Sequence, residues 1–172
     1  MQAFRNMWFL VGCLAFLAAA NISVYHAILV PRVLTVTVLA VGPVDKQNRT
    51  TLLHSPRGET LLIDTGPDAS ILRALGTALP MWQREIDAVI LTSSAARSAG
   101  GLPTVQSRYR ISKIIHIGDA TTPYGYSLVF DTSIIKILAP SIYSISSGSS
   151  VFKISSSTPP GVYISDGHTI AR

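Results

Sequence analysis

The alternation of apolar and polar residues along this chain predicts a series of short strands. Residues 33–41 alternate valine or leucine with threonine, which is typical of a strand. Residues 50–54 and 59–64 are further apolar runs on either side of Ser-Pro-Arg-Gly at 55–58, so we expect a hairpin with a turn there. The continuous apolar run 88–91 predicts a buried strand.

Two segments between these strands have the pattern of helices. From 69 to 79, apolar residues recur at i, i+1, i+4 and i+8, and Asp68 stands where a capping side chain is expected, so this helix should cover one face of the sheet. The second helix, 102–109, follows Gly100 and Gly101, which we expect to allow a tight turn into it. A strand at 113–118 comes next.

The C-terminal third is strand-like but less regular. Residues 127–130 and 134–138 predict a hairpin. Residues 141–158 are rich in serine with scattered apolar positions, which indicates a loop or a loosely paired hairpin. Residues 161–170 predict two short strands joined by an Asp-Gly turn. We therefore divide the chain into a membrane anchor or signal segment (1–32), a core (33–140) and a Ser-rich loop with a closing hairpin (141–172).

The N-terminal segment 7–30 is apolar apart from Asn21, Ser23 and His26. As a helix it would be about 36 Å long, enough to cross a bilayer once. The alternative is a secretory signal with cleavage near Ala20. We favour the anchor because apolar residues resume after Asn21. Both alternatives place the remaining chain on the outer side of the membrane.

Composition adds limited information about partners. Hydrophobic residues make up 48% of the chain and charged residues 13%, and part of this excess lies in the N-terminal segment. The net charge of +5 suits anionic partners such as phospholipid head groups or nucleic acid, and it also suits ordinary solubility. The single Cys13 excludes a disulfide framework within one chain. Phosphate-binding glycine loops, dinucleotide fingerprints and Gly-x-Ser-x-Gly are absent from the sequence.

Two strand-to-loop junctions carry a resemblance to a known family. The first reads Ile-Asp-Thr-Gly-Pro at 63–67; the second ends at Leu91-Thr92 and leads to Gly-Gly-Leu-Pro at 100–103. Over about residues 34–113 this spacing resembles the metallo-β-lactamase-like domain of ComEC-type DNA-internalisation (competence) proteins. The resemblance implies an α/β fold, a partial αβ half-sandwich with a mixed sheet and helices on one face. It also implies a preceding transmembrane helix in a bacterial cell membrane and a role in DNA uptake.

In that family the second junction carries a His-x-His-x-Asp-His run that holds metal. The matching positions here are Ser93, Ala95, Arg97 and Ser98. Hydroxyls and methyls are poor zinc ligands, and a guanidinium about 4 Å from a dication would be repelled by roughly 8 kcal/mol at a dielectric of about 20. The resemblance therefore implies a scaffold without metal or other cofactor. Its vestigial pocket would consist of Asp64, Thr92, Ser93, Arg97 and Ser98.

Three functions follow as hypotheses. The first is a membrane-anchored, metal-free pseudoenzyme that binds a partner, DNA or a membrane protein, or serves a structural role. The second is a metal-dependent hydrolase of nucleic acid or phosphoesters with ligands such as Asp64, His116 and His168. The third is a nucleic-acid-binding surface without catalysis, since no acidic residue interrupts the stretch 88–118. Its candidate contacts are Arg97, Arg108, Arg110 and Lys113. Trp82 is expected to pack under the sheet edge.

Overall fold

The computed structural model describes residues 11–21, 33–43, 48–117, 123–155, 157–165 and 170–171. The chain divides into two units, Met1–Pro31 and Arg32–Arg172. In the first unit residues 11–21 form an exposed helix that includes Cys13. No helix within the described ranges is long and apolar enough to cross a bilayer. The rest of the expected 7–30 span lies outside the described residues.

A seven-stranded mixed sheet forms the centre of the second unit, in the order β11-β10-β1-β2-β3-β4-β5. Its strands are β1 (Leu34–Val41), β2 (Asn48–His54), β3 (Thr60–Ile63), β4 (Glu85–Leu91), β5 (Arg110–His116), β10 (Gly161–Ser165) and β11 (Ile170–Ala171). The β3/β4 and β4/β5 pairs are parallel and the others antiparallel, so the expected mixed sheet is confirmed. The Asp166-Gly167 turn expected between the last two strands lies outside the described residues.

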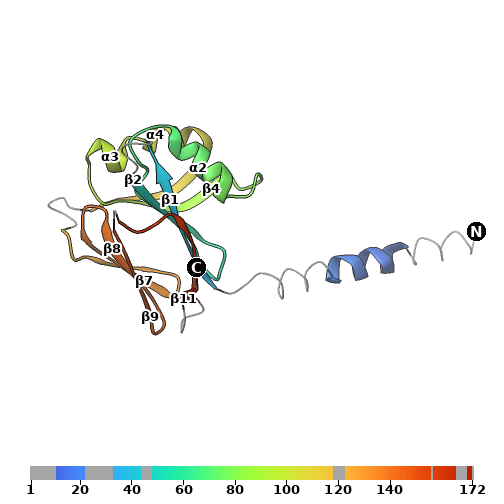
Figure 1. The fold of residues 1–172 in the computed structure, drawn as a ribbon. Coiled ribbons are helices and arrows are strands. Elements are labelled where there is room, and N and C mark those ends of the chain that lie inside the picture. Colours follow the sequence, from blue (N-terminus) through green and yellow to red (C-terminus); the bar gives the residue numbers. More distant parts are fainter. Residues whose placement is uncertain are drawn as a thin grey trace, which may run out of the picture. The chain divides into compact units, whose positions relative to one another are not determined.

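Helices cover one face of this sheet, as the apolar stripes predicted (Figure 1). They are α2 (Ser70–Ala78), α3 (Ala96–Ala99) and α4 (Leu102–Arg108). Ile71 and Leu75 of α2 and Val105 of α4 are buried in one cluster with Val89 and Leu91 of β4. The Ser70 N–H donates to Asp68 Oδ1 at 2.9 Å, so Asp68 satisfies one of the free N–H groups at the start of α2.

A second, four-stranded antiparallel sheet lies on the other face of the first (Figure 1). Its strands are β6 (Ser127–Phe130), β7 (Ser133–Ala139), β8 (Ile142–Ser147) and β9 (Ser150–Ile154). Of the two alternatives for 141–158, the hairpin is confirmed and the loop is wrong, because β8 and β9 pair along their length. Tyr143 and Ile145 point inward, and the intervening serines are the half-exposed members of an ordinary strand alternation.

The two sheets share a hydrophobic core. Ile135, Ile137 and Ile145 of the second sheet pack in one cluster with Val36 and Leu53 of the first. The Tyr143 hydroxyl, also buried there, donates to Thr51 Oγ1 at 2.5 Å across the sheets. The fold thus has a second sheet that the expected half-sandwich lacked, and the two sheets pack against each other. The boundary placed at residue 140 falls between the paired strands β7 and β8.

Candidate functional site

The carboxyl ends of β3 and β4 lie side by side because the two strands are parallel, and Asp64 and Thr92 follow them directly. The Thr92 N–H donates to Asp64 Oδ1 at 2.8 Å, and the Thr92 hydroxyl lies 2.8 Å from Oδ2 and 3.0 Å from Oδ1. The Asp64 N–H donates to the Ile90 carbonyl at 2.8 Å. Asp64 is only 2% exposed. We call this arrangement the Asp64–Thr92 clamp, since it ties two strand ends together.

The backbone of Asp64 is left-handed, with φ of 59°. Aspartate tolerates this conformation better than most residues. The same residue also uses its carboxylate to accept hydrogen bonds from Thr92 at the end of the neighbouring strand. Burial raises the pKa of Asp64 to about 6, although hydrogen bonds from Thr92, Ser141 and Ser98 act in the opposite direction. Desolvation is therefore the dominant influence on this carboxyl group.

Segments of the second sheet close over the clamp. The Ser141 N–H, from the turn between β7 and β8, donates to Thr92 Oγ1 at 2.9 Å. The Tyr124 hydroxyl, from the segment before β6, donates to the Thr92 carbonyl at 3.0 Å. Thr92 is consequently bonded through its N–H, its hydroxyl and its carbonyl, and it is fully buried.

The two loops that follow β3 and β4 are bonded to each other. The Ser98 carbonyl accepts from the Thr65 N–H at 2.7 Å and from the Thr65 hydroxyl at 3.0 Å, and the Gly101 N–H donates to the Gly66 carbonyl at 2.9 Å. Gly100 and Gly101 form the two-residue turn between α3 and α4, as expected, and both have a right-handed backbone. They are needed for space, because a Cβ on either would collide with backbone oxygens of residues 65–68.

The structure brings together only part of the residue set expected for the vestigial pocket. Asp64, Thr92 and Ser98 meet in the buried cluster. Ser93 and Arg97 do not join them: Ser93 Oγ accepts from the Ala95 N–H at 3.1 Å in a local turn, and Arg97 is exposed on α3. Ala95 is exposed as well.

Two of the ligands suggested for a hydrolase stand at the same end of the sheet but differ in burial. His116 ends β5 opposite Leu91 and is exposed, whereas Asp64, two strands away, is enclosed beyond the end of β3. His168 lies outside the described residues. Within the described ranges, no group of three or more His, Cys, Asp or Glu side chains is placed to hold a metal ion.

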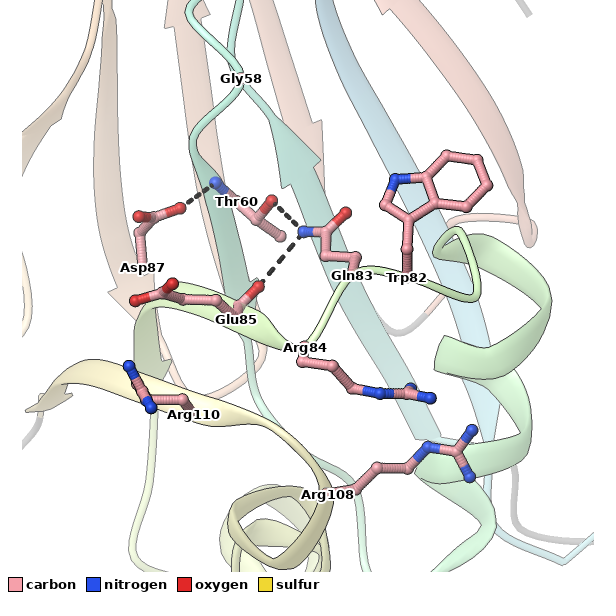
Figure 2. Close-up of a pocket in the computed structure, with 9 residues that line it drawn as sticks. All are labelled: Gly58, Thr60, Trp82, Gln83, Arg84, Glu85, Asp87, Arg108 and Arg110. Carbon is pink, nitrogen blue, oxygen red and sulfur yellow. Dashed lines mark hydrogen bonds between the residues drawn. The ribbon is translucent and has the colours of Figure 1, made fainter.

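A hollow of about 880 Å³ opens at the opposite end of the same parallel strands (Figure 2). Thr60 begins β3 and Glu85 begins β4, and both line it. The Asp87 carboxylate accepts from the Thr60 N–H at 2.7 Å. Gln83 Nε2 donates to Thr60 Oγ1 at 2.7 Å and to the Glu85 carbonyl at 3.2 Å. These bonds fix the floor of the hollow.

Arg84, Arg108 and Arg110 also line this hollow (Figure 2), and we call them the arginine trio. None of their side chains forms a hydrogen bond or ion pair with another described residue, and all three residues are exposed. Arg84 was missed by the sequence analysis. It immediately precedes β4, and Arg110 begins β5 opposite Glu85, so basic residues at the starts of neighbouring parallel strands were the available signal.

The four candidate nucleic-acid contacts do not form one surface. Arg108 and Arg110 line the hollow, Lys113 lies further along β5 opposite Ala88, and Arg97 follows the far end of β4. The length of β4 separates Arg97 from the other end of the sheet by roughly 20 Å.

Trp82 does not pack under the sheet edge as expected. It is 84% exposed, and so is its neighbour Met81. The apolar positions at this end of the helical layer are taken by Leu79 and Tyr109, which are buried in the helix-side core. The turn that follows Pro80 is therefore left outside the core.

No protein-family model matches the sequence, and no curated protein matches it. Among solved structures, a metallo-β-lactamase motif mutant from Cronobacter sakazakii is similar with a TM-score of 0.45, 12% identity, and coverage of 64% of this chain and 56% of that one. The rubredoxin oxygen:oxidoreductase of Desulfovibrio gigas has a TM-score of 0.45 and 13% identity, and the match covers 65% of this chain and 36% of that one. A peroxy diiron form of the chemotaxis sensor ODP has a TM-score of 0.40 and 14% identity, and the match covers 64% of this chain and 58% of that one.

This chain therefore spans less than two thirds of each of these proteins. Its own geometry is that of a mixed α/β protein, with two packed sheets and helices on the outer face of the larger one.

Proposed function

We propose that this chain is a degenerate metallo-β-lactamase-like domain, related to competence proteins, that acts as a metal-free binding or structural module. We further propose that residues 7–30 anchor it in a bacterial cell membrane, with the rest of the chain on the outer side. The single observation that carries the metal-free assignment is the loop after β4, where Ser93, Ala95, Arg97 and Ser98 stand at the positions at which the resembled family places its metal ligands. The Asp64–Thr92 clamp lies at the same strand ends.

The clamp supports a structural role because both carboxylate oxygens of Asp64 already accept hydrogen bonds from Thr92. A metal at this carboxylate would have to replace those bonds and would need a deprotonated, accessible ligand. Asp64 is instead enclosed, and burial raises its pKa to about 6. Ser141 and Tyr124 close the same space by bonding to Thr92.

Elemental analysis of the purified full chain tests this assignment. The chain is produced in medium supplemented with zinc and manganese and solubilised in detergent, then measured before and after dialysis against a chelator. We expect far less than one transition metal per chain in both samples. About one zinc or manganese per chain that survives dialysis would contradict the proposal and return the hydrolase hypothesis, with Asp64, His116 and His168 as the first residues to substitute.

The anchor is tested by fractionating cells that produce the full chain. We expect the protein to remain with the membranes after an alkaline carbonate wash, because an inserted helix is held by apolar burial rather than by charge. A soluble product that begins shortly after Ala20 would instead identify 1–20 as a cleaved signal and the protein as secreted.

A further inference from the structure

We infer that the turn carrying Met81 and Trp82, together with the arginine trio, is a docking surface for anionic phospholipid headgroups. This inference rests on the proposed membrane anchor, and it assigns the hollow of Figure 2, which the Asp64–Thr92 clamp does not involve. Three observations carry it: two exposed apolar side chains, unpaired cations next to them, and the point at which the chain enters the sheet.

The first observation is the exposure of adjacent large apolar residues. Met81 and Trp82 are each 84% exposed and lie in the turn between α2 and β4. In Figure 2 Gln83 reaches Thr60 on the floor of the hollow, whereas the indole of Trp82 leaves the backbone in a different direction. Tryptophan is enriched at membrane–water interfaces, where its ring is apolar and its N–H stays hydrated.

The second observation is the charge beside this turn. The guanidinium groups of Arg84 and Arg108 extend to the same side of the hollow (Figure 2). Two acidic residues also line the hollow: Asp87 accepts from the Thr60 N–H, and Glu85 accepts from the Ser112 hydroxyl at 3.4 Å. Neither carboxylate is bonded to an arginine of the trio, so the guanidinium donors are available for phosphate oxygens, which guanidinium groups bind in a bidentate geometry.

The third observation is strand register. Thr35 pairs with His54 and His54 with Thr60, so β1 begins at the same end of the sheet as the hollow. Three strand spacings, about 14 Å, separate β1 from β4 along the sheet. In the sequence only residues 31–33 connect segment 7–30 to β1, and three residues reach at most about 10 Å. The chain thus enters the sheet at the end where the hollow opens.

The test uses the full chain with Trp8→Phe, which leaves Trp82 as the only tryptophan because the sequence has 2. The chain is reconstituted into vesicles of phosphatidylcholine alone or mixed with phosphatidylglycerol, with and without brominated lipids. We expect a blue-shifted Trp82 emission in the anionic vesicles and quenching by brominated lipid about twofold stronger than in neutral vesicles. Arg84→Ala with Arg108→Ala should weaken this docking about tenfold or more. Arg97→Ala, at the far end of β4, should leave it unchanged.

Each other outcome overturns the inference in a distinct way. If the chain floats with the vesicles but Trp82 keeps a water-exposed emission in both lipids, the docking surface is wrong and the anchor stands. If the chain does not float with the vesicles, anchor and docking both fail. If Trp82 emission is unchanged by phosphatidylglycerol but shifts when oligothymidine is added to neutral vesicles, the surface binds nucleic acid and the lipid assignment is overturned.

Discussion

Asp64 shows how a residue that resembles a catalytic group can serve the scaffold. Its carboxylate accepts the N–H and hydroxyl of Thr92, and its left-handed backbone accompanies this contact. From the sequence, Asp64 suited either a loop hydrogen bond or a remnant of a catalytic pocket. The geometry favours the loop role because the group contacted is the end of the neighbouring strand.

The raised pKa of Asp64 leads to a prediction about stability and pH. The pKa rises from 3.8 to about 6 on folding, so between these values the folded chain binds more protons than the unfolded chain. The free energy of unfolding therefore falls as the pH increases from about 4 to 6, by about 2 kcal/mol from this residue. Asp64→Asn removes the titration and keeps an oxygen acceptor and tolerance of a left-handed backbone.

We expect the difference in unfolding free energy between Asp64→Asn and the parent to shift in favour of the variant by about 2 kcal/mol between pH 4 and pH 7. Urea unfolding of both chains at the two pH values, in the same detergent, measures this shift. An identical pH dependence in parent and variant would show that Asp64 titrates in the folded chain as it does in the unfolded one.

Gly101 provides a second prediction at this scale. A Cβ there would meet the Thr65 and Asp68 carbonyl oxygens and Ile71 Cγ2, so Gly101→Ala must push the two strand-end loops apart. We expect a loss of about 2 kcal/mol or more in the free energy of unfolding. The control is Gly76→Ala in α2, where nothing lies within 4 Å. It should stabilise the chain by about 0.5–1 kcal/mol. Thermal melting that ranked the two variants in the opposite order would refute this account of the Gly-Gly pair.

Among the elements, the central strands and both longer helices were predictable from periodicity, because β1 alternates and α2 has a continuous apolar stripe. The serine-rich strands were not. In β8 half of the residues are serines (Ser144, Ser146 and Ser147), and a strand that buries one face with few large residues resembles a loop in the sequence alone. Its inward residues become recognisable only when Thr51 and the opposite sheet supply their partners.

The packing of the second sheet leads to a prediction with a matched control in β7. Ile135 is 0% exposed and faces the first sheet, whereas its neighbour Ile134 is 49% exposed. Ile135→Ala should lower the free energy of unfolding by about 2–5 kcal/mol through lost burial and a residual cavity. Ile134→Ala should cost about 1 kcal/mol or less. Equal losses, measured by urea unfolding, would mean that the two sheets are not packed as described.

The candidate sites were harder to predict from the sequence than the strands and helices, because each site is assembled from several elements. Asp64 and Thr92, which the resemblance placed in one pocket, are brought together by the parallel pairing of β3 and β4. The arginine trio comes from the residue before β4, the end of α4 and the start of β5. The sequence named Arg108 and Arg110 as candidate contacts but not Arg84, since the stretch with no acidic residue begins only after Arg84 and Asp87.

In the sheet as a whole the two ends of the parallel strands differ in burial and in charge. At the carboxyl ends, loops from both sheets bond to Thr92 and to Asp64 and leave those groups buried. At the amino ends, a hollow stays open and carries exposed cations and an exposed indole. A domain that had kept metal chemistry would need the reverse at its carboxyl ends, with accessible ligands and bound water.

This contrast leads to a prediction about metal and the stability of the full chain. A ligand present at about 1,000 times its dissociation constant stabilises the folded state by about 4 kcal/mol, which for a chain of this size raises the melting temperature by about 8–16 °C. A micromolar site would show this shift in millimolar zinc or manganese. Because the Asp64 carboxylate is enclosed and already bonded, we expect melting temperatures in metal and in chelator to agree within about 1 °C. A rise of several degrees that Asp64→Asn abolishes would mean that the clamp opens to admit a cation, and that the strand ends retain the chemistry of the resembled family.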